Sequence, residues 1–272
     1  NDSVRKSEPG KGKTSLGKIF SVLGAKGGVG TTTFAVNLAT SIQALDKDKQ
    51  VALIDMNRLV GEVPLFLDLE TDTNWEEIGK NISRLDSAYL QSAMAKHSSG
   101  VYVLPAPSKF EAEAHLPPGS LFQLVRAMRQ FFDYIIVDSG MAIDDSSLRI
   151  FAESEAVYLV SIMSLPCVIN VKKLQETLFT TKGITNRKIR IIANRFEKKS
   201  QISLAEAKKI IGTDISETIP NNYSLAMTAI NSGKTVTEIS RKSNVARVYH
   251  KLANSTIDSG LGKSGKLFNW FK

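Results

Sequence analysis

The sequence contains little cysteine and no long apolar run. Its single cysteine, Cys167, cannot form a disulfide within the chain, which agrees with a reducing cytoplasm. No run of about 18 apolar residues occurs, so we expect no helix that spans a bilayer. The 272 residues are 42% apolar and 23% charged, which excludes collagen-like, low-complexity and disulfide-scaffold proteins. Length and composition instead fit one α/β domain with appendages.

The net charge of +8 is concentrated toward the two ends of the chain. Residues 1–18 carry +3 and residues 255–272 carry +2, which leaves +3 for the body. Basic runs are usually solvated, so this charge does not favour DNA binding. Residues 1–18 are rich in Lys, Gly and Ser and are predicted to be a flexible linker. Because the chain begins with Asn1 rather than Met, we expect an upstream region to be missing.

Apolar runs alternate with helical patterns between residues 19 and 254, which we predict to form one domain. Phe34, Leu38, Ile42 and Leu45 recur at helical spacing, and further helices are expected at 120–132 and 170–181. Nearly continuous apolar runs are typical of parallel strands that are covered on both faces. We therefore predict an α/β fold with a doubly wound, mostly parallel sheet and helices on both faces, its strands at 19–23, 51–54, 101–104, 134–137, 157–162 and 189–193.

The first predicted strand runs into a glycine-rich loop that a helix follows. Residues 24–33 read Gly-Ala-Lys-Gly-Gly-Val-Gly-Thr-Thr-Thr. Glycines let successive backbone N–H groups converge on phosphate oxygens, and a helix N-terminus adds partial positive charge. A hydroxyl just inside the helix, here Thr32, can bind Mg²⁺. The pattern predicts a phosphate-binding loop, and the alternative is a plain tight turn.

Here the sequence resembles the deviant Walker A ATPases of the ParA/MinD family, which have a P-loop NTPase fold. The loop of that family, K-G-G-x-G-K-[ST], matches Lys26, Gly27, Gly28, Val29, Gly30 and Thr32, but Thr31 replaces its second lysine. The resemblance implies that Lys26 reaches across a homodimer to the partner's nucleotide. The missing lysine would contact the β and γ phosphates, and losing such a charge-assisted hydrogen bond costs about 1.5–3 kcal/mol. The expected ligands are ATP and Mg²⁺, bound by residues 26–33, including Thr33.

Two predicted strand ends carry acids in the places where the family uses them. Asp55 matches the first acid of the family's D-x-D pair and is expected near the metal, whereas Asn57 stands where the second acid positions water. Asp138 ends a strand that resembles Walker B and would hold Mg²⁺ through water. Each Asp could instead cap a helix or a turn. The implied metal residues are Thr32, Asp55 and Asp138, and the implied catalytic residues are Lys26, Asp55 and the altered Asn57.

The two departures, Thr31 and Asn57, indicate a protein that binds ATP as a dimer and hydrolyses it weakly or not at all. One alternative is an active ParA/MinD ATPase for DNA partitioning, division-site or flagellar placement, in which Lys26 compensates for Thr31. Another is a nucleotide-free dimer that serves as an interaction module.

Several short stretches resemble the TadZ/CpaE branch of pilus-assembly proteins, across about residues 19–253. They are residues 27–33, 104–107, 142–145, 194–196 and 219–223. The resemblance implies that Asn194, Arg195, Pro220 and Asn221 line the adenine pocket. It further implies an upstream receiver-like domain, pilus-secretion and polar-localisation partners, and a cytoplasmic location, peripheral on the membrane's inner face or at a pole.

The chain ends in a Gly/Ser linker and an aromatic, basic tail. Leu267, Phe268, Trp270 and Phe271 can share one helical face, with lysines beside them. Such a segment can lie in a membrane interface, so membrane contact through residues 266–272 is one hypothesis. The others are a helix packed on the domain and a hook for a partner protein.

Overall fold

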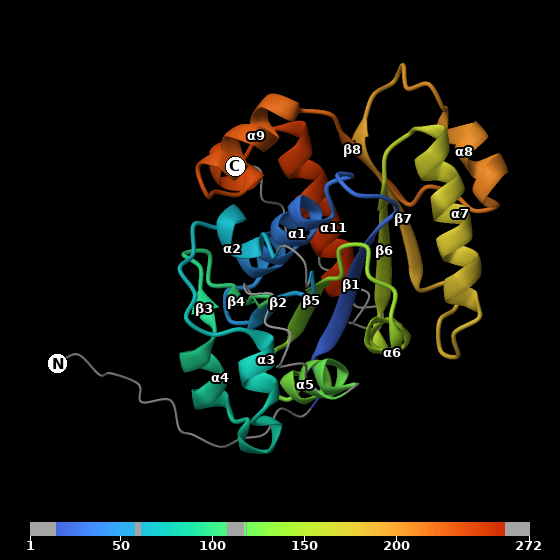
Figure 1. Cartoon of the computed structure of the whole chain (residues 1–272). Helices are drawn as coiled ribbons and strands as arrows, with labels where there is room; N and C mark the ends of the chain where they lie inside the picture. Colours follow the sequence, from blue (N-terminus) through green and yellow to red (C-terminus); the bar gives the residue numbers. More distant parts are fainter. Residues whose placement is uncertain (1–14, 58–60, 108–116, 118, 259–272) are drawn as a thin grey trace.

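The computed structural model describes residues 15–57, 61–107, 117 and 119–258, with only the backbone of Ser83. Within these residues the strands form one sheet in the order β3-β4-β2-β5-β1-β6-β7-β8, with β3 antiparallel to β4 and the other neighbours parallel (Figure 1). The strands are β1 (Lys18–Gly24), β2 (Val51–Asp55), β3 (Ala95–Lys96), β4 (Tyr102–Leu104), β5 (Tyr134–Asp138), β6 (Ala156–Ser161), β7 (Ile189–Phe196) and β8 (Glu217–Pro220).

Helices cover both faces of the sheet, as the apolar strands predicted. In chain order the helical elements are α1 (Thr31–Leu45), α2 (Val63–Phe66), α3 (Trp75–Gly79), the 3₁₀ turn η1 (Ile82–Arg84), α4 (Ser87–Ala93), α5 (Ser120–Met128), α6 (Asp145–Glu153), α7 (Leu165–Phe179), α8 (Leu204–Ile211), α9 (Tyr223–Asn231), α10 (Val236–Ile239) and α11 (Asn244–Asp258). The predicted fold class is therefore confirmed.

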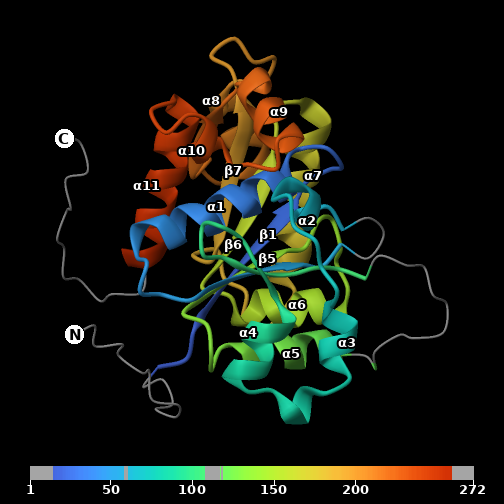
Figure 2. The same cartoon turned by 90° about the vertical axis from the view of Figure 1, so that its left-hand side faces the viewer.

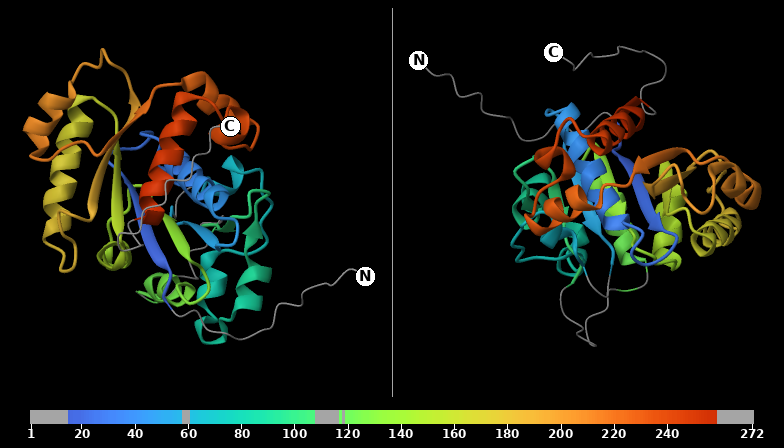
Figure 3. Two further views of the ribbon diagram at one scale, coloured as in Figure 1. Left: turned by 180° about the vertical axis from the view of Figure 1, so that it is seen from behind. Right: turned by 90° about the horizontal axis from the view of Figure 1, so that it is seen from above.

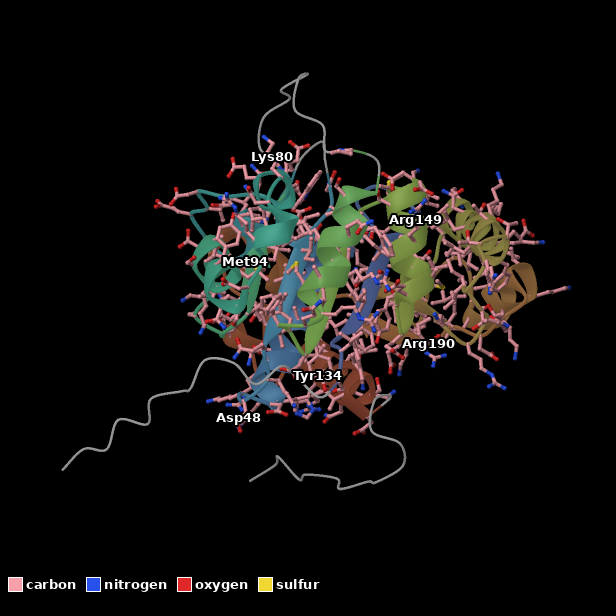
Figure 4. The ribbon with its side chains drawn as sticks, turned by 90° about the horizontal axis from the view of Figure 1, so that it is seen from below. Asp48, Lys80, Met94, Tyr134, Arg149 and Arg190 are labelled. Carbon is pink, nitrogen blue, oxygen red and sulfur yellow. The ribbon has the colours of Figure 1, made fainter. Side chains whose placement is uncertain are left out.

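Alternate residues of the central strand divide the core between the two faces. Phe20 and Val22 of β1 pack with α1 and α11, whereas Ile19 and Leu23 face the layer that contains α5, α6 and α7. Helices α1 and α11 lie side by side (Figures 2 and 3). Seen from below, α5 and α6 cross the other face, with Arg149 of α6 at the surface (Figure 4).

Two strands lack a sequence signal that we recognised. The antiparallel strand β3 is only two residues long, and β8 has the burial pattern of a half-exposed edge. Because edge strands are short and need one apolar face only, they do not produce the continuous apolar runs of the central strands. β3 and β8 lie at the two edges of the sheet, outside the six strands that the apolar runs predicted.

The last described helix continues past Asn254, where the sequence suggested that the domain ends. Helix α11 extends to Asp258 because Thr256 is buried and its hydroxyl forms a 2.8 Å hydrogen bond with Tyr158 Oη of β6. The domain limits at residues 19 and 254 stay predictions, and most of the predicted linker and the whole tail at 266–272 lie outside the described residues. Among the described helices, none has the length and apolarity that a membrane crossing requires.

Candidate functional site

The glycine-rich loop follows β1, which lies between β5 and β6 in the sheet. Gly24 N–H donates to Gly140 O at 2.7 Å and Ala25 N–H donates to Val160 O at 2.8 Å. From α7, Asn170 Nδ2 donates to Ala25 O at 3.0 Å. These bonds anchor the start of the loop to the ends of the two neighbouring strands. Ligands in open α/β sheets bind at this kind of place, where the order of strands reverses.

Two glycines of the loop have backbone angles that other residues rarely adopt. Gly28 has φ +76° and Gly30 has φ +93°. A Cβ at Gly30 would lie 2.4 Å from Asn194 Nδ2, whereas a Cβ at Gly28 would meet nothing within 4 Å. Gly30 is therefore required both by its φ angle and by the close approach of Asn194.

The side chains of Lys26 and Thr31 lie in different environments. Lys26 is exposed on the loop, together with Gly27 and Gly28. Thr31 is 9% exposed, and its Oγ1 lies 2.4 Å from where a Cβ on Gly24 would stand. The Thr31 hydroxyl therefore lies against the start of the loop, and its position carries no positive charge.

Asp55 and Asp138 lie in register at the carboxyl ends of the paired strands β2 and β5. Both side chains are fully buried. Asp55 Oδ1 accepts the Asn57 N–H at 2.9 Å and its Oδ2 accepts the Val63 N–H at 3.1 Å. Asp138 Oδ1 accepts the Gly140 N–H at 3.1 Å. The tertiary structure therefore brings together two acids that are far apart in the sequence.

The pKa values of both acids are raised. The pKa of Asp55 is raised from 3.8 to about 7. Burial is the larger cause, and the negative charge of the nearby Asp138 carboxylate is the second. Burial raises the pKa of Asp138 from 3.8 to about 6, although a hydrogen bond from the Thr32 side chain opposes this rise. Burial therefore disfavours the charged form of each acid.

This part of the site fits a hydrated magnesium ion. Asp138 Oδ2 is buried and accepts no hydrogen bond of normal geometry within the described residues. Thr32 supplies a hydroxyl beside it. The described residues contain no cluster of three or more His, Cys, Asp and Glu side chains that could hold a metal ion. Water and phosphate oxygens would therefore complete the shell, as Mg²⁺ commonly requires.

Asn57 lies two residues after the end of β2 and faces the turn that follows β5. Its Cγ would lie 3.6 Å from a Cβ built on Gly140. The residue therefore lies near Asp138, in the region where the resemblance expects an acid that positions water. An amide there cannot act as a carboxylate base.

A pocket lies beside the loop, at the ends of β7 and β8. It brings together the four residues expected around an adenine, and it also contains residues that sequence analysis did not single out, among them Val245 and Tyr249. The lining includes Gly30, Thr33, Asn194, Arg195, Pro220, Asn221, Tyr223, Val245 and Tyr249. Asn194 Nδ2 donates to Val29 O at 2.8 Å, so the pocket is bonded directly to the loop.

Sequence analysis missed a buried polar contact behind this pocket. Asn37 on α1 donates through Nδ2 to Thr33 O at 2.8 Å, and its Oδ1 accepts the Val236 N–H at 2.9 Å. This amide joins the first turn of α1 to the start of α10. In the sequence Asn37 is one of several polar residues of this helix, and its partner lies 199 positions away in the chain.

We predict that Gly30→Ala destabilises the protein by more than about 2 kcal/mol, since it combines a strained φ angle with a clash against Asn194. Gly28→Ala, which is strained but sterically free, should cost about 1–2 kcal/mol. Gly27→Ala is the unstrained control. Urea unfolding measures all three, and equal losses for the variants at 28 and 30 would contradict the proposed clash.

The two acids also predict how stability depends on pH. Because their pKa values are higher in the folded protein than in the unfolded chain, metal-free protein should lose stability as the pH rises from about 4 to about 7. Asp138→Asn keeps the oxygen that accepts the Gly140 N–H and removes one buried charge. At pH 8 it should raise the free energy of unfolding by about 1–3 kcal/mol.

Urea unfolding in EDTA at pH 5 and pH 8 measures this effect. The exposed Asp72→Asn serves as the control and should leave the profile unchanged. A lower stability of Asp138→Asn at pH 8 would show that burial does not penalise the charge.

Comparisons with known proteins agree with this geometry. A family model described as an AAA domain (AAA_31) matches residues 17–191. The chain is 26% identical over 253 residues to the septum site-determining protein MinD of Thermotoga maritima, covering 90% of each chain. It is 26% identical over 180 residues to the antiactivator FleN of Pseudomonas aeruginosa, covering 65% of this chain and 61% of FleN.

Solved structures show the same fold. The ParA family ATPase of Chlorobium tepidum superposes with a TM-score of 0.82 at 26% identity, over 87% of this chain and 98% of that one. MinD of Pyrococcus horikoshii, solved in complex with Mg-ADP, gives a TM-score of 0.74 at 19% identity, over 89% and 96%. The matched domain and these relatives show that the chain belongs to the AAA domain family AAA_31 and is a ParA/MinD-type P-loop protein.

Proposed function

We propose that this protein binds ATP and Mg²⁺, dimerises with nucleotide bound, and hydrolyses it very slowly or not at all. It then acts as a localisation scaffold of the TadZ/CpaE type, which positions a Tad or type IV pilus secretion machine. Nucleotide would serve as an assembly ligand, because a ligand that binds only the dimer favours the dimer by mass action.

The observation that carries this proposal is the uneven loss of charge around the loop. The metal side keeps Thr32, Asp55 and Asp138, whereas neutral Thr31 and Asn57 stand where the family pattern has a lysine and an acid. Because Thr31 lies against the start of the loop, it does not replace the reach or charge of a lysine. Phosphate binding through backbone N–H groups survives this loss better than stabilisation of the transition state.

The surface around the loop supports dimerisation. Lys26 is exposed, and Met141 and Leu165 nearby are 57% and 50% exposed. Met141 Sδ lies 3.7 Å from a Cβ built on Gly27, and Leu165 begins α7, which also holds the loop through Asn170. A second copy of the chain would cover these apolar side chains and bring its own Lys26 to the nucleotide.

The pilus assignment rests on the order of short motifs. The stretches at 104–107, 142–145, 194–196 and 219–223 all lie at or just after carboxyl ends of strands, on the side of the sheet that carries the loop. Motifs gathered around one site support a branch-level resemblance better than the same motifs dispersed over the surface.

An active ATPase for partitioning or division-site placement is the alternative, and one observation favours it. Charge is uneven within the body: residues 165–251 contain sixteen Lys and Arg against six Asp and Glu, whereas residues 62–86 contain seven acids against two bases. A positively charged half can attract a polyanion such as DNA. The names of two relatives agree with this alternative: one is a septum site-determining protein, MinD, and the other is a ParA family ATPase.

We predict that the wild-type protein releases phosphate from ATP much more slowly than about 1 s⁻¹, the low end of common enzyme turnover. The double variant Thr31→Lys with Asn57→Asp should be faster by about 100-fold, because it restores the charge that stabilises the transition state and the acid near the water. Thr31→Ser keeps a neutral hydroxyl and is the matched control, which should stay slow.

Phosphate release from purified protein with Mg²⁺ measures these rates. Wild-type turnover near 1 s⁻¹ would contradict the scaffold and favour the active ATPase. Clear binding of random duplex DNA at low salt would point to partitioning.

We also predict that ATP and Mg²⁺ convert the wild-type protein to a dimer and that Lys26→Ala stays monomeric, since the exposed Lys26 would lose its contact with the nucleotide of the partner subunit. Nucleotide affinity of the monomer should change by less than about threefold, because no contact within the subunit is removed. Light scattering after gel filtration measures the mass. Lys80→Ala, directly after α3, serves as the control at a distant position (Figure 4).

The same variant tests the cellular role. In the native host, Lys26→Ala should lose correct pilus placement and leave septum position unchanged. A Lys26→Ala protein that dimerises like the wild type, or a displaced septum with normal pili, would contradict the proposal.

A further inference from the structure

Three asparagines line the pocket beside the loop: Asn194, Asn221 and Asn222. Asn222 Oδ1 accepts the Leu225 N–H at 3.2 Å at the start of α9, so the further question is how the amides of the other two are oriented. An amide oxygen and nitrogen have similar shapes, so only a hydrogen-bond partner with a single role can tell them apart. Both Asn194 and Asn221 have such partners. The orientation of each amide determines whether the pocket offers a base a donor or an acceptor.

Asn194 is held by the backbone alone. Its Nδ2 donates to Val29 O at 2.8 Å, and its Oδ1 accepts the Arg195 N–H at 2.9 Å. A carbonyl can only accept and a backbone N–H can only donate, so this amide has one orientation. No variable side chain contributes to that choice.

Asn221 is held by the carboxylate of Glu197. Asn221 Nδ2 donates to Glu197 Oε1, and the backbone N–H of Asn221 donates to Phe196 O at 2.9 Å. An ionised carboxylate can only accept, so the NH₂ group of Asn221 must face Glu197. Asn221 lines the pocket and Glu197 does not. With Nδ2 turned to Glu197, Oδ1 is the oxygen that the Asn221 amide can offer to a ligand in the pocket.

The Glu197 carboxylate is not needed for the turn in which it lies. Ser200 N–H and Ser200 Oγ both donate to the backbone oxygen of Glu197, at 3.0 and 2.6 Å. These bonds do not involve the carboxylate, and the Glu197 side chain is exposed. Replacing the carboxylate therefore changes the orientation of Asn221 without removing the bonds that form the turn.

We infer that Glu197 is a positioning residue for base recognition, which holds Asn221 Oδ1 toward the pocket and so favours a purine with an amine at C6 over a 6-oxo purine. The inference rests on the proposed nucleotide binding and adds the selectivity of the same pocket. A 6-amino group donates to Oδ1, whereas a 6-oxo group places a second acceptor opposite it and leaves both oxygens unpaired. Asn194 keeps its orientation independently of Glu197.

The experiment compares ATP with inosine triphosphate, which has an oxygen in place of the 6-amino group. Isothermal titration with Mg²⁺ should show that the wild type binds ATP at least about tenfold more tightly than inosine triphosphate. Glu197→Gln has the same shape, but its amide can donate or accept, so Asn221 can turn over. The selectivity should then fall to about threefold or less, chiefly because inosine triphosphate binds more tightly.

Matched variants separate positioning from a structural role. Lys198→Ala, on the neighbouring exposed side chain, should keep the wild-type selectivity. Asn221→Ala should lose it, and the double variant of Glu197→Gln with Asn221→Ala should show no further change, because both residues act through one oxygen. Thermal unfolding confirms that each variant is folded.

An unchanged ATP preference in folded Glu197→Gln would overturn this inference while leaving nucleotide binding intact. A wild type that binds neither triphosphate would overturn the proposed function, and the selectivity with it.

Discussion

The attachment of the glycine-rich loop to the ends of β5 and β6 is the constraint on which the rest of the site depends. Gly24 and Ala25 donate backbone hydrogen bonds to Gly140 O and Val160 O. These bonds fix the start of the loop at the carboxyl ends of the strands. β1 can make both contacts because it lies between these strands. The same arrangement puts Asp138, at the end of β5, beside the first turn of α1, which contains Thr32.

The electrostatics of the site follow from that placement. Two carboxylates, Asp55 and Asp138, are buried where phosphates would add further negative charge. The family pattern offsets this charge with a lysine in the loop, and this chain has Thr31 there. In the function that we propose, a divalent cation, backbone N–H groups and Lys26 would offset the remaining negative charge. Nucleotide binding would then depend on Mg²⁺ and on a second subunit more than on turnover.

The pocket and the glycine-rich loop form one connected unit. Asn194 bonds Val29 O in the loop, and Gly30 must lack a side chain to let it approach. On the other side, Val245 and Tyr249 of α11 line the pocket, and the Tyr249 ring lies 6.0 Å from that of Phe34 on α1. The pocket is therefore lined by residues from both the first and the last helix of the described domain.

The sequence by itself determined the parts that depend on short-range patterns. The glycine loop, the apolar strands and the positions of Asp55 and Asp138 at strand ends were readable, because periodicity and spacing along the chain encode them. The sequence also showed that neutral Thr31 and Asn57 replace the lysine and the acid of the family pattern. The short strands β3 and β8 were not, since edge strands need little apolar sequence.

Only the tertiary structure decided which distant groups meet and how they are oriented. It paired Asn37 with Val236, joined Asn194 to Val29, and placed Glu197 against Asn221. It also raised the pKa values of Asp55 and Asp138 through burial, which no local pattern contains. The physical reason is that hydrogen-bond direction and desolvation depend on neighbours in space, and folding brings those neighbours from different strand ends.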